Sequence, residues 1–226
     1  MFKKINPSEL IFWIAISVLC ALKVTVGDAG FFAKYVPVGE IDIALYNWQK
    51  WAYHFFSTFL LFAVIPALIV KTALNGSLKD IGICLGDWKF GVGATLAAFV
   101  VLIFPTYLSS QNPEHLEFYP LTTLATASPY FFGLWSLTYL PHYIGWELFF
   151  RGFVGFEAHK RYGIVAGIGL PTLLTTLMHI GKPTGELWGA MLGGIYMSFL
   201  TFRTRSILWV ILFHWYLGLL NSYFCG

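Results

Sequence analysis

Long runs of apolar residues dominate the chain, and short connectors rich in Gly, Pro and Asn separate them. A helix needs about 20 mostly apolar residues to cross the hydrocarbon core of a bilayer. Turn-forming residues mark the connectors, as in the segments 75–77 and 181–183. The apolar runs cover residues 10–26, 51–70, 90–108, 129–156, 164–180, 187–202 and 207–224. This pattern predicts an all-α, polytopic membrane helical bundle with about seven transmembrane helices.

The composition supports a single membrane domain. Of the 226 residues, 58% are hydrophobic and 11% are charged, whereas a soluble domain has roughly 45–50% and about 25%. So few charged side chains cannot cover the surface of a soluble protein of this size. The net charge of +3 is spread over loops, which excludes a basic stripe for nucleic acid. We expect residues 1–226 to form one integral membrane domain in contact with the lipid bilayer.

Basic residues in the connectors indicate an orientation. Cytoplasmic loops carry an excess of Lys and Arg, and a cytoplasmic N-terminus places nine of these residues inside and three outside. The same topology puts the acidic loop 109–127 outside. The first run exceeds the apolar region of a cleaved signal peptide, so we expect it to remain as an anchor. The sequence predicts a multi-pass cell-membrane protein with a cytoplasmic N-terminus and an external C-terminus.

Four ionisable residues stand out inside the predicted spans: Glu147, Arg151, His179 and His214. Each costs about 2.5–3.5 kcal/mol at the centre of a bilayer, so each is a candidate functional residue. The first two are four residues apart and can form an ion pair on one helix. Two histidines and a glutamate from three helices could activate water, bind a metal or stabilise an oxyanion. A structural clamp between helices is the alternative explanation.

Other polar residues in the apolar runs are weaker candidates. His142 and Trp146 lie on the same predicted span as Arg151, and Asn221 follows His214 by seven residues on about the same helical face. The three remaining histidines are expected at interfaces or in loops: His54, His115 and His159.

Three segments, in this order, resemble the CPBP family of intramembrane proteins. They are Trp146–Gly152 (Trp-Glu-Leu-Phe-Phe-Arg-Gly), the stretch that starts at His179 (His-Ile-Gly-Lys-Pro), and Arg203–His214. The family includes the CAAX prenyl endopeptidases and the Abi-like bacteriocin-processing or self-immunity proteins. The resemblance covers about residues 131–221, which would form the family-like core, and it implies an intramembrane endopeptidase.

The motifs depart from the family pattern at three positions. In the family motif Glu-Glu-x-x-x-Arg, Trp146 occupies the position of the first Glu and Glu147 that of the second. Thr175 stands where a Phe precedes the His of the second motif. Gly218 stands where an Asn or Asp follows the last His, unless Asn221 replaces it one turn later. Neighbouring helical residues project about 100° apart, so we expect Trp146 to pack against a neighbouring helix or to line the substrate cleft.

The resemblance also implies roles for the candidate residues. Glu147 would be the general base for a water that His179 holds, and His214, helped by Asn221, would donate to the oxyanion. Arg151 and Trp146 would support the site. The substrate would be a membrane-associated peptide or protein, cleaved at a peptide bond near the bilayer.

A zinc site is possible at the same place. Glu147, His179 and His214 form a His₂Glu set that leaves one position open for water. Zinc would occupy the only carboxylate of the predicted core, so we favour a reaction without cofactors.

Two other classes of protein compete with the protease. A catalytically silent CPBP-like immunity or scaffold protein would explain the replacement of the first Glu by Trp146. A small transporter would also contain intramembrane His and Glu, but the inverted repeat that is typical of transporters is absent from the sequence. No motif in the sequence indicates a particular substrate or an oligomeric state.

Overall fold

The computed structural model describes residues 6–226, and this part of the chain contains helices and no β-strand. The first half comprises α1 (Pro7–Thr25), α2 (Ala29–Tyr35), α3 (Ile43–Phe59), η1 (Leu60–Val64), α4 (Ile65–Thr72), η2 (Leu78–Ile81), α5 (Trp88–Ser109) and α6 (Pro113–Leu116). The second half comprises η3 (Thr123–Thr126), α7 (Pro129–Glu147), η4 (Leu148–Phe156), α8 (Glu157–Tyr162), α9 (Ile164–Leu177), α10 (Thr184–Thr204) and α11 (Leu208–Phe224). The predicted all-α class is confirmed.

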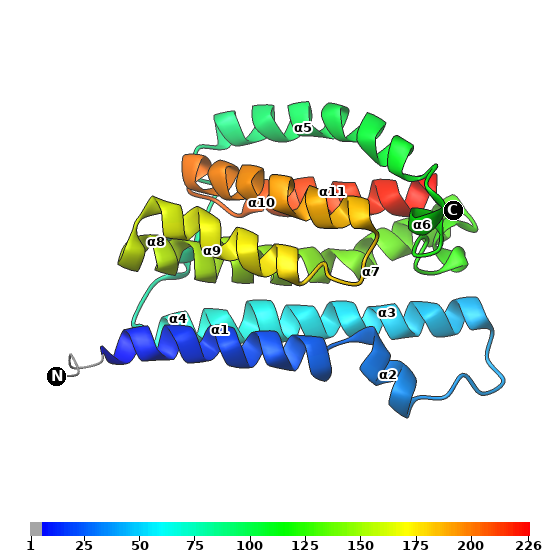
Figure 1. Ribbon diagram of the computed structural model, residues 1–226, viewed down its shortest axis with the longest axis horizontal. Helices are drawn as coiled ribbons and strands as arrows, with labels where there is room; N and C mark the ends of the chain where they lie inside the picture. Colours follow the sequence, from blue (N-terminus) through cyan, green and yellow to red (C-terminus); the bar gives the residue numbers. More distant parts are fainter. Residues whose placement is uncertain (1–5) are drawn as a thin grey trace.

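The long helices run roughly along one common axis (Figure 1). Helices α1, α3 and α4 form one side of the bundle, α5 covers the opposite side, and α7 to α11 lie between them. Helix α3 packs against α7, α9 against α10, and α11 against α5. Helix α1 begins at one end of the bundle, and the C-terminus of the chain lies at the other end. The predicted orientation of these two ends across a membrane stays a prediction.

The helices suit a membrane environment. Three of them are long and apolar enough to cross a bilayer: Pro7–Thr25, Ile43–Thr72 and Trp88–Ser109, and α9 and α11 are shorter apolar helices. Large apolar side chains of α5, such as Val100 (72% exposed) and Phe104 (67%), point away from the bundle, as lipid-facing residues do. These apolar helices indicate a membrane protein, and the number of seven spans remains a prediction.

Two boundaries differ from those predicted. The second helical segment begins at Ile43 instead of residue 51, because the Asp42 carboxylate accepts hydrogen bonds from two backbone N–H groups of the first turn and caps the helix there. Helix α9 ends at Leu177, so His179 lies in the turn after the helix rather than within it.

Helix α7 continues into a π-helical segment at the position of the candidate residues. Ser128 caps α7 and Pro129 occupies its first turn. Glu147 is the last residue of the α-helical part, and Arg151 lies inside the π-helix η4. The wider turn shifts the faces of the helix relative to an ideal α-helix, and such π-turns are frequent at functional sites.

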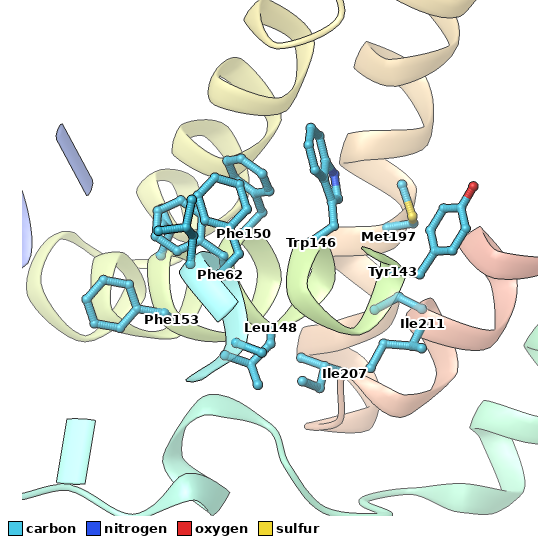
Figure 2. Packing of buried hydrophobic residues seen from close by; sticks show 14 of the residues in the cluster. Phe62, Tyr143, Trp146, Leu148, Phe150, Phe153, Met197, Ile207 and Ile211 are labelled. Carbon is cyan, nitrogen blue, oxygen red and sulfur yellow. The ribbon is translucent and has the colours of Figure 1, made fainter. Parts of the chain in front are cut away.

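An aromatic core fixes η4 against η1. The rings of Phe62 and Phe149 stack with centroids 4.2 Å apart, and Phe150 and Trp146 pack around them. Figure 2 shows Phe62, Phe150 and Phe153 at the π-helical segment, with Tyr143 and Trp146 on one side of α7 and Met197 of α10 near them. The core therefore fixes the rotation of the segment that carries Glu147 about the helix axis and its position along that axis.

The contact between α3 and α7 depends on Gly145. A Cβ atom at this position would lie 2.6 Å from the backbone oxygen of Thr58, whereas a Cβ at Gly133 of the same helix would meet nothing within 4 Å. Because the obstacle is backbone, Gly145→Ala should destabilise the protein by about 1–3 kcal/mol. Thermal unfolding of detergent-solubilised protein checks this, with Gly133→Ala as the matched control. Equal melting temperatures of the two variants would contradict the expected close contact.

Candidate active site

Glu147 is the centre of the polar group in the bundle. Its side chain is completely buried, at 0% exposure. Its Oε1 lies 2.6 Å from Nδ1 of His214 and accepts a hydrogen bond from Nη1 of Arg151 at 3.3 Å. The structure thus confirms the predicted i,i+4 contact with Arg151 and adds a contact with α11.

These contacts determine which nitrogen of His214 carries the proton. A carboxylate oxygen accepts hydrogen bonds, and an imidazole nitrogen that faces it donates one. Nδ1 of His214 is therefore the donor to Glu147, and Nε2 keeps its lone pair. In the neutral imidazole, Nε2 can therefore accept a proton while the buried carboxylate holds the other ring nitrogen, Nδ1.

A cavity of about 840 Å³ lies beside this pair. Helices α1, α3, α5, α7, α10 and α11 contribute to its walls, together with the turn after α9. His214, Arg151 and His179 line the cavity, but Glu147 does not. A molecule in the cavity would therefore meet the imidazole of His214, and Glu147 would act on it only through this histidine.

His179 lies on another wall of the same cavity. Its Nδ1 is 2.7 Å from the backbone oxygen of Thr175, so Nδ1 carries the proton and Nε2 is free to accept one. Among residues 6–226, no hydrogen bond joins His179 to Glu147 or to His214. The structure places His179 on the wall of the same cavity as His214, without direct contact to the carboxylate.

Trp146 packs between two histidines. Its indole stacks on the ring of His142, with centroids 5.4 Å apart, and meets His179 edge to face at 5.9 Å. The side chain is 7% exposed and lines the cavity. Trp146 thus contacts the turn after α9 and forms part of the cavity wall.

Asn221 also lies on the cavity wall. It is 8% exposed and sits on α11 about two turns after His214. The structure records no hydrogen bond between its side chain and His214 within residues 6–226. Asn221 can contact a molecule in the cavity, but within the described residues its side chain makes no hydrogen bond to Glu147 or His214.

Comparison with known protein families gives one match, to part of the chain. Residues 128–220 match the family model described as type II CAAX prenyl endopeptidase Rce1-like. This segment is Rce1-like. The match is consistent with a CPBP family intramembrane protease, nearly coincides with the expected core of residues 131–221, and supports a function of the CAAX-type protease kind. Neither a curated protein nor a solved structure matches the chain.

The sequence analysis missed a second polar cluster, which lies outside the Rce1-like segment. Nζ of Lys23 donates to the backbone oxygen of Gly27 at 2.6 Å and lies 3.1 Å from Nδ1 of His54. His54 in turn lies 3.4 Å from a carboxylate oxygen of Asp28 and stacks on His142. The hydrogen bond from His54 is the main cause that lowers the pKa of Asp28.

Two histidines that were expected at interfaces or in loops line the cavity. His54 lies on α3, and His115 lies on α6 in the connector between α5 and α7. His115 is 4% exposed, because the segment 110–127 folds back over the end of the bundle. The sequence signal that could have indicated this cluster was the position of Lys23 inside an apolar run.

The predicted zinc ligands do not fit a metal ion as they are arranged. Within the described chain, no three His, Cys, Asp or Glu side chains lie close enough to hold one ion together. In addition, Oε1 of Glu147 already faces both Arg151 and His214. The Rce1-like segment therefore presents a carboxylate–imidazole pair instead of a His₂Glu metal set.

The burial of the Glu147–Arg151 pair leads to a prediction. Removal of one member of a buried pair leaves an uncompensated charge, which typically costs about 3–5 kcal/mol. Arg151→Met should therefore destabilise the protein strongly, and Glu147→Gln/Arg151→Met should recover part of the loss. Arg203→Met is the control, because the pair of Arg203 with Asp87 is exposed.

Chemical denaturation in detergent measures the stability of the wild type and of these three variants. Arg203→Met should change stability little, because water screens an exposed pair. If Arg151→Met and Arg203→Met had the same effect, the Glu147 carboxylate would not depend on Arg151.

Proposed function

We propose that this protein is an intramembrane endopeptidase that hydrolyses a peptide bond of a membrane-proximal or lipid-associated peptide or protein. The observation that carries the proposal is the 2.6 Å contact between Glu147 and Nδ1 of His214, on the wall of the large cavity. A histidine that a carboxylate orients and supports is a general base of a kind that hydrolases use. The Rce1-like match supports the class of reaction.

The proposed chemistry starts at Nε2 of His214. This nitrogen takes a proton from a water molecule while the oxygen attacks the carbonyl carbon of the substrate. Glu147 stabilises the imidazolium ion that forms, and Arg151 donates a hydrogen bond to Glu147. The imidazolium then gives its proton to the leaving amine as the C–N bond breaks. Glu147 is thus a positioning residue, and His214 is the catalytic residue that meets the water.

His179 has a supporting role in the same proposal. Its free Nε2 can accept the second hydrogen of the attacking water, because Nδ1 is already bound to the Thr175 carbonyl. Two acceptors on different walls of the cavity would orient the water towards the substrate. We propose that this reaction proceeds without zinc, since the protein groups supply the base.

The test begins with cells that carry wild-type protein or Glu147→Gln. Comparative peptidomics identifies the substrate as the membrane protein that stays uncleaved in the variant. With that substrate and purified protein, His214→Ala and His179→Ala should each lower kcat by about 10²-fold or more, about 2.7 kcal/mol of barrier. The control is His159→Ala, because His159 is the histidine of the chain that does not line the cavity.

The double variant Glu147→Gln/His214→Ala distinguishes a shared step from independent ones. Because Glu147 acts through His214, the double variant should lose no more activity than His214→Ala alone. Full additivity of the two losses would refute the pair as a functional unit. A wild-type protein that cleaves nothing in vesicles would refute the proposed function itself.

A catalytically silent immunity or scaffold protein is the second candidate. Trp146, which stands at the position of the first Glu of the family motif, fills part of the cavity wall with an indole ring and favours this function. Trp146→Glu distinguishes the two candidates. If the Glu147–His214 pair works, the new carboxylate should lower the melting temperature and bring no gain in cleavage, because it buries a second charge. A large gain over a nearly inactive wild type would favour the silent protein.

A further inference from the structure

Gly218 and Tyr143 share one small volume on the cavity wall. A Cβ atom at position 218 would overlap the hydroxyl oxygen of Tyr143 and would lie 2.6 Å from its Cζ atom. Tyr143 is 3% exposed, and both residues line the cavity. The absence of a side chain at 218 therefore lets the phenol of Tyr143 on α7 reach the surface of α11.

This hydroxyl lies beside the proposed base. The rings of Tyr143 and His214 pack against each other with centroids 4.8 Å apart. Tyr143 is four residues before Glu147 on α7, and Gly218 is four residues after His214 on α11. Figure 2 shows the phenol projecting to the same side of α7 as Trp146, which is the side of the cavity.

Other hydroxyl groups on the cavity wall are less suited to meet the reacting carbonyl. Thr106 and Thr175 donate their protons to backbone oxygens of their own helices. Tyr139 is one turn farther from Glu147 along α7 and stacks on Phe55, with centroids 4.2 Å apart. Tyr143 is thus the cavity-lining tyrosine whose ring packs on His214.

We propose that the Tyr143 hydroxyl donates a hydrogen bond to the oxyanion that forms when water attacks the substrate carbonyl. The inference rests on the proposed hydrolysis. The new C–O bond forms as the carbonyl electrons move to the carbonyl oxygen, which accepts the hydrogen bond from Tyr143. His214 holds the proton of the water and passes it to the leaving nitrogen when the C–N bond breaks, so Tyr143 keeps its own proton. A donor of this kind acts on the charge that develops in the transition state.

Tyr143→Phe tests the hydroxyl alone, with Tyr130→Phe as the matched control, because Tyr130 lies on the same helix and is 70% exposed. The substrate is the membrane protein that stays uncleaved in cells with Glu147→Gln. Tyr143→Phe should lower kcat by about 10²-fold and leave KM within about twofold, because the bond strengthens only in the transition state. Tyr130→Phe should keep kcat close to that of the wild type, because Tyr130 does not line the cavity.

A rescue variant separates catalysis from folding. Tyr143→Ala removes the ring, and Tyr143→Ala/Gly218→Asn places an amide donor in the vacated space. The double variant should be at least about tenfold more active than Tyr143→Ala. One oxyanion donor typically changes kcat by about 10²- to 10³-fold, and the new amide should restore part of this effect. A misfolded protein could not show such a gain. Melting temperatures of all variants are recorded in the same detergent.

The outcomes are distinct. The inference is overturned if Tyr143→Phe keeps a kcat within about threefold of an active wild type, or if the added amide brings no gain over Tyr143→Ala. In both cases the wild type still cleaves, so the proposed function stands. If the wild type itself cleaves nothing, the proposed function fails and the inference fails with it.

Discussion

The burial of one carboxylate in an apolar bundle is the constraint on which the rest of this structure depends. A Glu side chain at 0% exposure is tolerated when donors from the protein replace water. Arg151 supplies one donor from the next turn of the same helix, and His214 supplies the other from α11. Glu147 therefore links two helices that are far apart in the sequence, and the positions of α7 and α11 follow from this contact.

The requirement for close approach explains much of the remaining packing. Gly145 lets α3 pack against α7 at backbone distance, and Gly218 admits the Tyr143 phenol to the surface of α11. The π-helix η4 adds a wider turn between Glu147 and the end of the helix, and stacked aromatic rings around Phe62 and Phe149 hold that turn in place. Close contacts with α3 and α11 thus hold α7 in place, and the cavity lies beside this helix.

The helices before the Rce1-like segment contribute more than a membrane anchor. Lys23, Asp28 and His54 form a polar cluster on the cavity wall, and the stacking of His54 on His142 joins this cluster to α7. The ring of Trp146 continues the stack to His179. A continuous set of polar and aromatic side chains therefore runs along the cavity from the N-terminal helices to the turn after α9.

The sequence by itself determined the helical class, the membrane composition and the residues that cannot be buried without partners. It also determined the Glu147–Arg151 contact, because helical geometry brings residues four apart together. Only the tertiary structure decided that Glu147 faces His214 instead of the cavity, since the rotation of α7 depends on packing against α3 and on the π-turn. The cluster around Lys23 and the Tyr143–Gly218 contact were hidden for the same reason. The residues of each contact lie far apart in the chain. Helical periodicity and local spacing do not predict which faces of distant helices pack together.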